Sequence, residues 1–79
     1  MQDWIEENNK LKRSFKFNDF VEAWEFMSQV AQIAEEMEHH PTWTNTYNQV
    51  DIQLSTHDAG DKVTEKDRNL AQKINELLP

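Results

Sequence analysis

The histidines of the sequence are the first candidates for chemistry. His39 and His40 are adjacent, and His57 follows within a window of 19 residues. Imidazoles exchange protons near pH 7, so they can serve acid–base catalysis without a metal. Glu35 precedes His39 by four residues, a spacing that predicts a carboxylate–imidazole contact on one helix face and a fixed ring tautomer. Glu38 adds a second carboxylate close to the same pair.

Other interpretations of these histidines remain open. Side chains at a helix end often cap its last carbonyls, which His39 and His40 could also do. The three histidines with Glu35 could bind a metal ion, although successive helical residues diverge by about 100° and the sequence has no H-E-x-x-H pattern. Asp67 has a structural explanation, because it follows Thr64 at the spacing of a capping box.

The aromatic and basic residues are weaker indicators of function than the histidines. Trp43 and Tyr47 could form a wall against a flat ligand, but packing also explains aromatic residues on a strand. The basic residues of the first hairpin are best explained as a solvated strand face; they are Lys10, Lys12, Arg13 and Lys16. With 8 Lys and Arg against 15 Asp and Glu, the net charge of −7 argues against direct nucleic-acid binding.

The first half of the chain should form a β-hairpin and a helix. A short apolar run at residues 4–6 and an alternating run at residues 11–17 flank Asn8-Asn9, whose residue type suits a tight turn. A helix is expected from about residue 19 to 38, with apolar residues three and four apart. Its main stripe comprises Phe20, Ala23, Trp24, Met27, Val30, Ala31, Ala34 and Met37.

The second half of the chain should form a further strand, which could be two, and a second helix. Residues 43–55 alternate as a half-buried strand with a core face of Val50, Ile52 and Leu54, and this stretch could break into two strands near residues 44–46. A loop over residues 57–63 precedes a helix with apolar positions at Leu70, Ala71, Ile74, Leu77 and Leu78. The order predicts an α+β two-layer sandwich, an antiparallel sheet with helices packed on one face.

Size and composition favour one small domain, residues 1–79, that associates with copies of itself. The chain has no cysteine, and a core this small has little apolar area to spare. Phe26 and Ile33 extend the apolar face of the first helix, either as scattered surface residues or as a contact with a partner subunit. No membrane span or signal segment is expected, and the location is expected to be cytoplasmic.

The spacing of the candidate residues resembles a known signature. The sequence reads Glu35-x-x-x-His39-His40-Pro41, then Tyr47, His57 and Asp67 at separations that resemble those of the pterin-4a-carbinolamine dehydratases. The similarity covers nearly the whole chain, from about Trp4 to Leu78. It extends to Phe15-Lys16-Phe17-x-x-Phe20, Pro41-x-Trp43, Tyr47-Asn48-x-Val50-x-Ile52-x-Leu54-x-Thr56-His57 and Asp67-x-x-Leu70-Ala71.

The resemblance implies an activity and a fold. Enzymes of that family remove water from 4a-hydroxytetrahydropterin to give quinonoid dihydropterin, which recycles the pterin cofactor, and they need no metal or organic cofactor. Their fold is a four-stranded antiparallel sheet with helices on one face. By resemblance, His39 and His57 form the acid–base pair and His40 mainly holds the substrate. The remaining residues expected at the substrate site are Glu35, Glu38, Pro41, Trp43, Ser55, Thr56 and Asp67.

The resemblance also implies partners. The family forms dimers and tetramers, and in animals a member is a dimerisation cofactor of a homeodomain transcription factor. A non-catalytic protein-binding module of the same fold is therefore the alternative, although it would have no chemical reason to keep all three histidines with Glu35. Members usually carry a helix before the first strand, where this sequence begins, so a homodimer is expected more than a homotetramer. They also often have Gly-Gly where this sequence has Gly60-Asp61.

Overall fold

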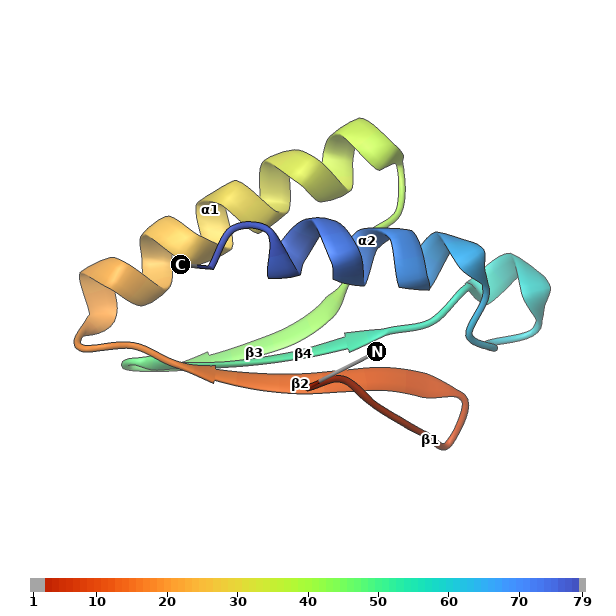
Figure 1. Ribbon diagram of the computed structural model, residues 1–79, viewed down its shortest axis with the longest axis horizontal. Coiled ribbons are helices and arrows are strands. Elements are labelled where there is room, and N and C mark those ends of the chain that lie inside the picture. Colours follow the sequence, from red (N-terminus) through yellow and green to blue (C-terminus); the bar gives the residue numbers. More distant parts are fainter. Residues whose placement is uncertain (1–2, 79) are drawn as a thin grey trace.

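The computed structural model describes residues 3–78. The chain folds into a four-stranded antiparallel sheet with two helices on one face (Figure 1). The strand order is β1-β2-β4-β3, and all neighbours pair antiparallel. The predicted α+β two-layer sandwich is therefore confirmed. The elements are β1 Ile5–Glu7, β2 Lys10–Lys16, α1 Phe20–Met37, β3 Thr42–Thr46, β4 Gln49–Leu54, the short 3₁₀ helix η1 His57–Ala59 and α2 Glu65–Asn75.

Two tight turns set the register of the sheet. Asn8 and Asn9 adopt φ of 52° and 63°, which an Asn-Asn hairpin turn tolerates. The alternating stretch 43–55 does break into two strands, but at Tyr47-Asn48 and not at residues 44–46. Asn48 determines this position, because its carbonyl accepts the backbone N–H of Phe17 at 2.9 Å and its side chain donates to the Phe17 carbonyl at 2.9 Å.

Capping residues define both ends of α1. The Asp19 side chain accepts the backbone N–H of Glu22 at 2.9 Å, as expected of an N-cap. At the other end Glu38 adopts φ of 52°, and its N–H bonds the carbonyls of Ala34 and Glu35. The helix thus ends at Met37, one residue before the predicted end, because a left-handed residue closes it before Pro41 is reached.

The buried face of α1 differs from the predicted one. Phe26 is only 5% exposed and its ring lies 4.7 Å from that of Phe15, so the prediction of an outward second stripe at Phe26 is wrong. Trp24, assigned to the core stripe, is 58% exposed. The buried face of α1 instead comprises Ala23, Phe26, Met27, Val30 and Ala34. Ile33 is partly buried against the core.

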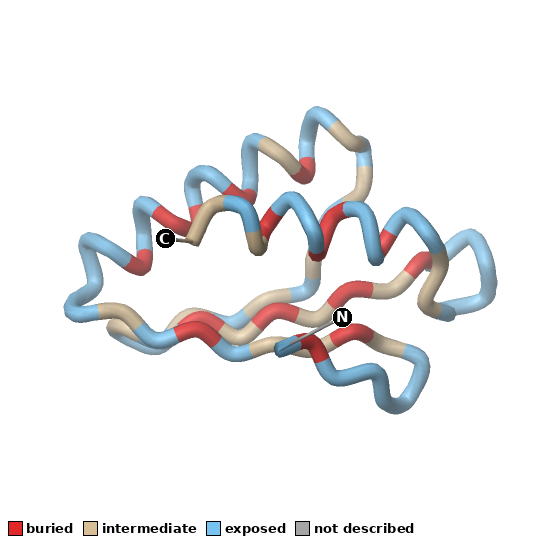
Figure 2. The backbone as a smooth tube through the Cα atoms, in the orientation of Figure 1, coloured by how far each residue is buried: buried red, intermediate tan, exposed pale blue. Residues whose placement is uncertain are grey.

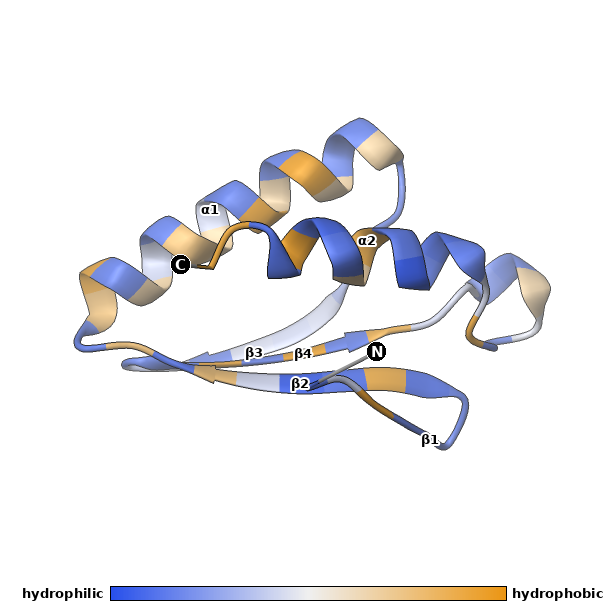
Figure 3. Ribbon diagram, in the orientation of Figure 1, coloured by the Kyte–Doolittle hydropathy of each residue, from blue (hydrophilic) through white to orange (hydrophobic). Residues whose placement is uncertain are grey.

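The core lies between the helices and the sheet. Buried positions line the inner sides of α1, α2 and the sheet, and exposed positions face outward (Figure 2). The same inner surfaces carry the most hydrophobic residues of α2 and β4 (Figure 3). The predicted core face of Val50, Ile52 and Leu54 is confirmed. Among the described residues, no helix is long and apolar enough to cross a membrane.

Candidate active site

The end of α1 directs the two adjacent histidines to different carboxylates. His39 Nε2 lies 2.6 Å from Asp67 Oδ1, and His40 Nε2 lies 2.8 Å from Glu35 Oε1. The predicted contact between Glu35 and His39 is therefore wrong. The left-handed turn at Glu38 takes both histidines off the helix, so the four-residue helical spacing no longer applies. Since each Nε2 bonds a carboxylate, neither of these nitrogens caps a helix carbonyl.

Asp67 is a buried carboxylate with three hydrogen-bonding partners. Its side chain is 0% exposed, and its Oδ2 accepts the Thr56 hydroxyl at 2.7 Å and the Thr64 backbone N–H at 2.8 Å. The last of these contacts completes the capping box predicted for α2. Its other oxygen faces His39, so an ionised Asp67 places the ring proton on Nε2. Nδ1 of His39 is then the nitrogen with a free lone pair.

His57 lies at the start of η1 with an exposed side chain. The ring is 90% exposed, and Nδ1 lies 3.0 Å from Oδ1 of Asp61. The hydrogen bond to Asp61, and then the negative charges of Asp61 and Asp58, raise the pKa of His57 above its usual value. Water screens such an exposed pair, so its contribution to stability is small.

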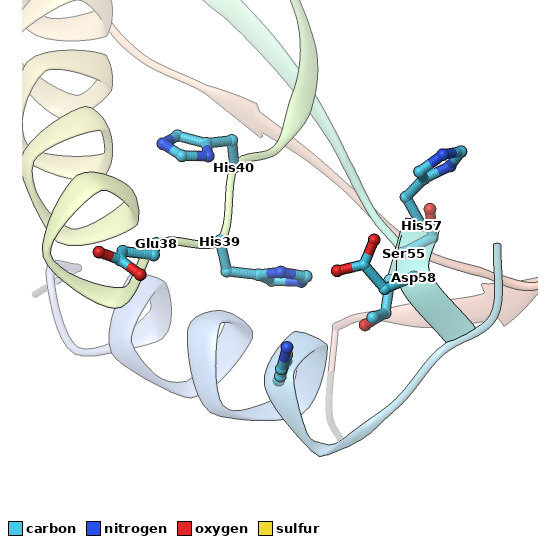
Figure 4. Close-up of a pocket in the computed structure, with 8 residues that line it drawn as sticks. Glu38, His39, His40, Ser55, His57 and Asp58 are labelled. Atoms are coloured by element: carbon cyan, nitrogen blue, oxygen red, sulfur yellow. The ribbon is translucent and has the colours of Figure 1, made fainter. Parts of the chain in front are cut away.

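A cavity of about 250 Å³ brings the three histidines together. Its lining residues are Glu38, His39, His40, Ser55, Thr56, His57, Asp58 and Lys66. Figure 4 shows His39 reaching across the cavity toward Asp58, whereas the His40 ring turns toward α1 and His57 stands on the far wall. Basic and acidic side chains therefore occur on both sides of the cavity, with Glu38 beside the two adjacent histidines and Asp58 beside His57.

Two lining residues were missed in the sequence. Asp58 directly follows a candidate histidine, and this position in the sequence could have indicated it as a site residue. Lys66 reaches the cavity from the first turn of α2, and its approach depends on how α2 packs, so no spacing indicates it. Four of the residues expected at the substrate site do not line this cavity; they are Glu35, Pro41, Trp43 and Asp67. Glu35 and Asp67 instead contact the histidines that do.

The structure does not bring the candidate aromatic wall to the histidines. Trp43 lines a separate apolar hollow of about 290 Å³ together with Trp24, Met27 and neighbouring residues of α1. Tyr47 lies in the β3–β4 turn with φ of 51° and is 63% exposed. The strand break explains this, because it removes Tyr47 from the strand on which both aromatics were expected.

The donor set does not form a metal centre. Among residues 3–78, no three His, Cys, Asp or Glu side chains gather where they could hold a metal ion. His39 and His40 each bond a different carboxylate, which directs the two rings apart. The arrangement instead offers one imidazole with a free Nδ1 and a second that favours its protonated form, which suits the transfer of protons to and from a small ligand.

Comparison with known proteins shows the family to which this chain belongs. Residues 1–77 match the family model described as "Pterin 4 alpha carbinolamine dehydratase". A Sulfolobus acidocaldarius protein named "Putative pterin-4-alpha-carbinolamine dehydratase" is 51% identical over 77 residues, covering 98% of this chain and 84% of the relative. A Prochlorococcus marinus protein of the same name is 48% identical over 75 residues, covering 95% and 78%.

Solved structures agree with the fold. The crystal structure of a "transcriptional coactivator/pterin dehydratase" from Brucella melitensis is 42% identical, with a TM-score of 0.93 over 99% of this chain and 84% of that one. A pterin dehydratase-like protein, described as a RuBisCO assembly factor in the alpha-carboxysome, is 23% identical with a TM-score of 0.75 and shares the fold. With a family match over nearly the whole chain and relatives at about half identity, this chain belongs to the pterin-4a-carbinolamine dehydratase family.

Proposed function

We propose that this protein is a 4a-hydroxytetrahydropterin dehydratase that works by histidine acid–base catalysis without a metal or organic cofactor. The observation that carries the proposal is that His39 and His57 line one cavity and each bonds a carboxylate through a different ring nitrogen. His39 has its Nε2 bonded to a buried carboxylate, whereas His57 has carboxylates that favour its protonated form. Family membership supplies the substrate class.

The reaction needs one proton removed and one delivered. His39 Nδ1 takes a proton from a ring nitrogen of the pterin, and the electrons of that N–H bond form a C=N bond to C4a. The C4a–O bond breaks, and the departing hydroxyl takes a proton from His57 and leaves as water. His39 ends protonated and His57 neutral, and exchange with solvent restores both. Each proton transfer of this kind contributes about 10²- to 10⁴-fold in rate.

The remaining walls suit a small flat ligand rich in donors and acceptors. A cavity of about 250 Å³ is close to the lower end, about 300 Å³, of typical small-ligand sites. Ser55, Thr56 and the carboxylates of Glu38 and Asp58 can receive the ring N–H and amino groups. The substrate-holding role that the resemblance gives His40 remains part of the proposal; its Nε2 bonds Glu35 at 2.8 Å, which leaves Nδ1 for a ligand.

Stopped-flow measurement of carbinolamine dehydration tests the proposal. The wild-type protein should accelerate dehydration, and the His39→Ala/His57→Ala double variant should lose at least about 10²-fold in kcat while staying folded. Glu25→Gln, which removes a charge from the exposed side of α1, serves as the control and should leave kcat unchanged. Near wild-type turnover in the double variant would refute the assignment.

The exposed part of α1 supports a second proposal, self-association as a homodimer or homotetramer. Phe20, Val21 and Trp24 are large apolar residues left in solvent, and the Phe20 and Trp24 rings stack at 6.4 Å. Monomeric proteins rarely expose contiguous apolar patches of this kind. The same patch fits the alternative of a protein-binding module, since the Brucella melitensis structure is described as a transcriptional coactivator as well as a pterin dehydratase. A wild-type protein without dehydratase activity would favour that alternative.

A further inference from the structure

We propose that Asp61 is a positioning residue for the dehydration: its carboxylate engages Nδ1 of His57 and leaves Nε2 as the nitrogen that delivers the proton to the departing hydroxyl. This inference rests on the proposed function and deepens it. It assigns the acid role to His57, and it gives a role to a residue that neither lines the cavity nor belongs to the histidine signature.

The geometry of the loop brings the two side chains together. An isolated β-bridge joins Thr56 to Lys62, with N–H···O distances of 2.8 Å and 3.3 Å in the two directions. Within this closed loop the Gly60 N–H donates to the His57 carbonyl at 3.0 Å. His57 and Asp61 are the residues just inside the bridge at each end. Their side chains therefore meet, with Nδ1 and Oδ1 3.0 Å apart.

The backbone at Asp61 does not by itself call for an aspartate. Its φ is 59°, in the left-handed region that glycine occupies without steric cost and asparagine tolerates. Gly60 before it has φ of 84°. Glycine would satisfy the loop at position 61 with less strain, so the loop conformation does not account for the carboxylate. The contact with His57 does account for it.

The charges around His57 favour its protonated form on balance. Asp58 and Asp61 come from its own loop and raise its pKa, the hydrogen bond to Asp61 being the largest cause. The titratable groups that line the cavity from the α1–β3 connection and from α2 are Glu38, His39, His40 and Lys66. None of these groups is among the causes of the raised pKa of His57, which are the two aspartates of its own loop, opposed by burial. A raised pKa keeps a histidine protonated to higher pH, so Asp61 extends the range over which His57 can donate.

The second histidine–aspartate pair has the complementary arrangement. Asp67 engages His39 through Nε2, so Nδ1 is the free nitrogen there, whereas Asp61 engages His57 through Nδ1. Asp67 is buried and Asp61 is exposed. Thr56 connects the two pairs, since its hydroxyl donates to Asp67 and its backbone closes the loop that holds Asp61. The two pairs therefore leave different ring nitrogens available, Nδ1 in His39 and Nε2 in His57.

The test applies two independent pH titrations to each of the variants Asp61→Asn and Asp61→Gly. Asparagine and glycine both accept the left-handed backbone, so the loop conformation should be kept. NMR titration of the full chain follows the three imidazoles, and the pH dependence of kcat/KM reports the free enzyme's acid and base. We expect the His57 pKa to fall in both variants. We also expect the alkaline limb of kcat/KM to move to lower pH by the same amount, with Asp61→Glu restoring part of both shifts.

The outcomes separate this inference from the proposed function. The control Glu25→Gln should leave both titrations unchanged. If the wild-type protein shows no dehydration, the proposed function fails, and the NMR titration still reports whether Asp61 controls His57. If the enzyme is active but the alkaline limb stays fixed while the His57 pKa falls, His57 is not the acid and the inference is wrong. A higher kcat in Asp61→Gly, with the alkaline limb of kcat/KM unchanged, would also overturn the inference. In that case Asp61 would hold the His57 ring in a less productive orientation.

Discussion

Replacing Asp67 by asparagine should reverse the tautomer of His39 while leaving the fold in place. The amide oxygen can take the position of Oδ2 and accept the Thr56 hydroxyl and the Thr64 N–H, as the carboxylate does at 2.7 and 2.8 Å. The amide NH₂ then faces His39, whose Nε2 must act as acceptor. The ring proton moves to Nδ1, and the nitrogen that should act as base becomes blocked.

The magnitudes follow from burial and bond type. Asp67 is 0% exposed, so its charged hydrogen bonds are not screened by water. Hydrogen bonds to charged groups contribute about 1.5–3 kcal/mol and neutral ones about 0.5–1.5 kcal/mol, so Asp67→Asn should cost about 1–3 kcal/mol of unfolding free energy. Asp67→Ala leaves its partners unsatisfied and should cost about 3–5 kcal/mol. A chain of 79 residues has only about 4–12 kcal/mol in total, so the alanine variant would lose a large share of it.

The kinetic loss should be much larger than the stability loss suggests. In serine proteases the corresponding Asp-to-Asn change, which leaves geometry intact but reverses the tautomer, lowers kcat about 10⁴-fold. We expect Asp67→Asn to lower kcat by about 10²–10⁴-fold. Urea unfolding, stopped-flow dehydration and imidazole ¹⁵N shifts measure stability, rate and tautomer.

A matched control is available in the same turn of α2. Glu65 is exposed, and Glu65→Gln removes one negative charge there without contacting His39. This variant should keep wild-type kcat. A folded Asp67→Asn protein with kcat within tenfold of wild type, or with the proton still on Nε2 of His39, would refute the reasoning.

Three further outcomes are expected. Thr56→Val removes the hydroxyl that donates to Asp67 at 2.7 Å and should lower the unfolding free energy by about 1–3 kcal/mol in urea titration; an unchanged midpoint would mean that water replaces the hydroxyl. Trp24→Glu should reduce the mass in light scattering to that of the 9.4 kDa monomer while activity per chain is kept, and a wild-type mass of 9.4 kDa would contradict self-association. Treatment with a chelator should leave kcat and Tm unchanged, and one zinc per chain in elemental analysis would contradict metal-free catalysis.

Much of the fold was predictable because local sequence patterns determine it. Alternation in residues 43–55 identified the core face of β4, and the spacing of Thr64 and Asp67 identified the start of α2. Asn8-Asn9 marked a tight hairpin turn. These features depend on neighbours a few residues apart, so periodicity and capping rules capture them.

Features that depend on packing were not predictable in the same way. Phe26 and Trp24 both fit a helical stripe, and only the docking of α1 on the sheet buries the first and exposes the second. A two-residue turn at Tyr47-Asn48 moved Tyr47 away from the histidines, because a contact with Phe17, 31 residues distant along the chain, fixes where the strand breaks.

The sequence by itself determined which groups could do chemistry: three histidines, nearby carboxylates and the spacing that resembles one family. Only the tertiary structure decided which carboxylate each histidine engages. A left-handed residue at Glu38 breaks the helical spacing that would have paired Glu35 with His39, and the packing of α2 brings Asp67 across from 28 residues away. Contacts between residues so distant in sequence depend on how the helices pack on the sheet, and no local spacing in the sequence indicates them.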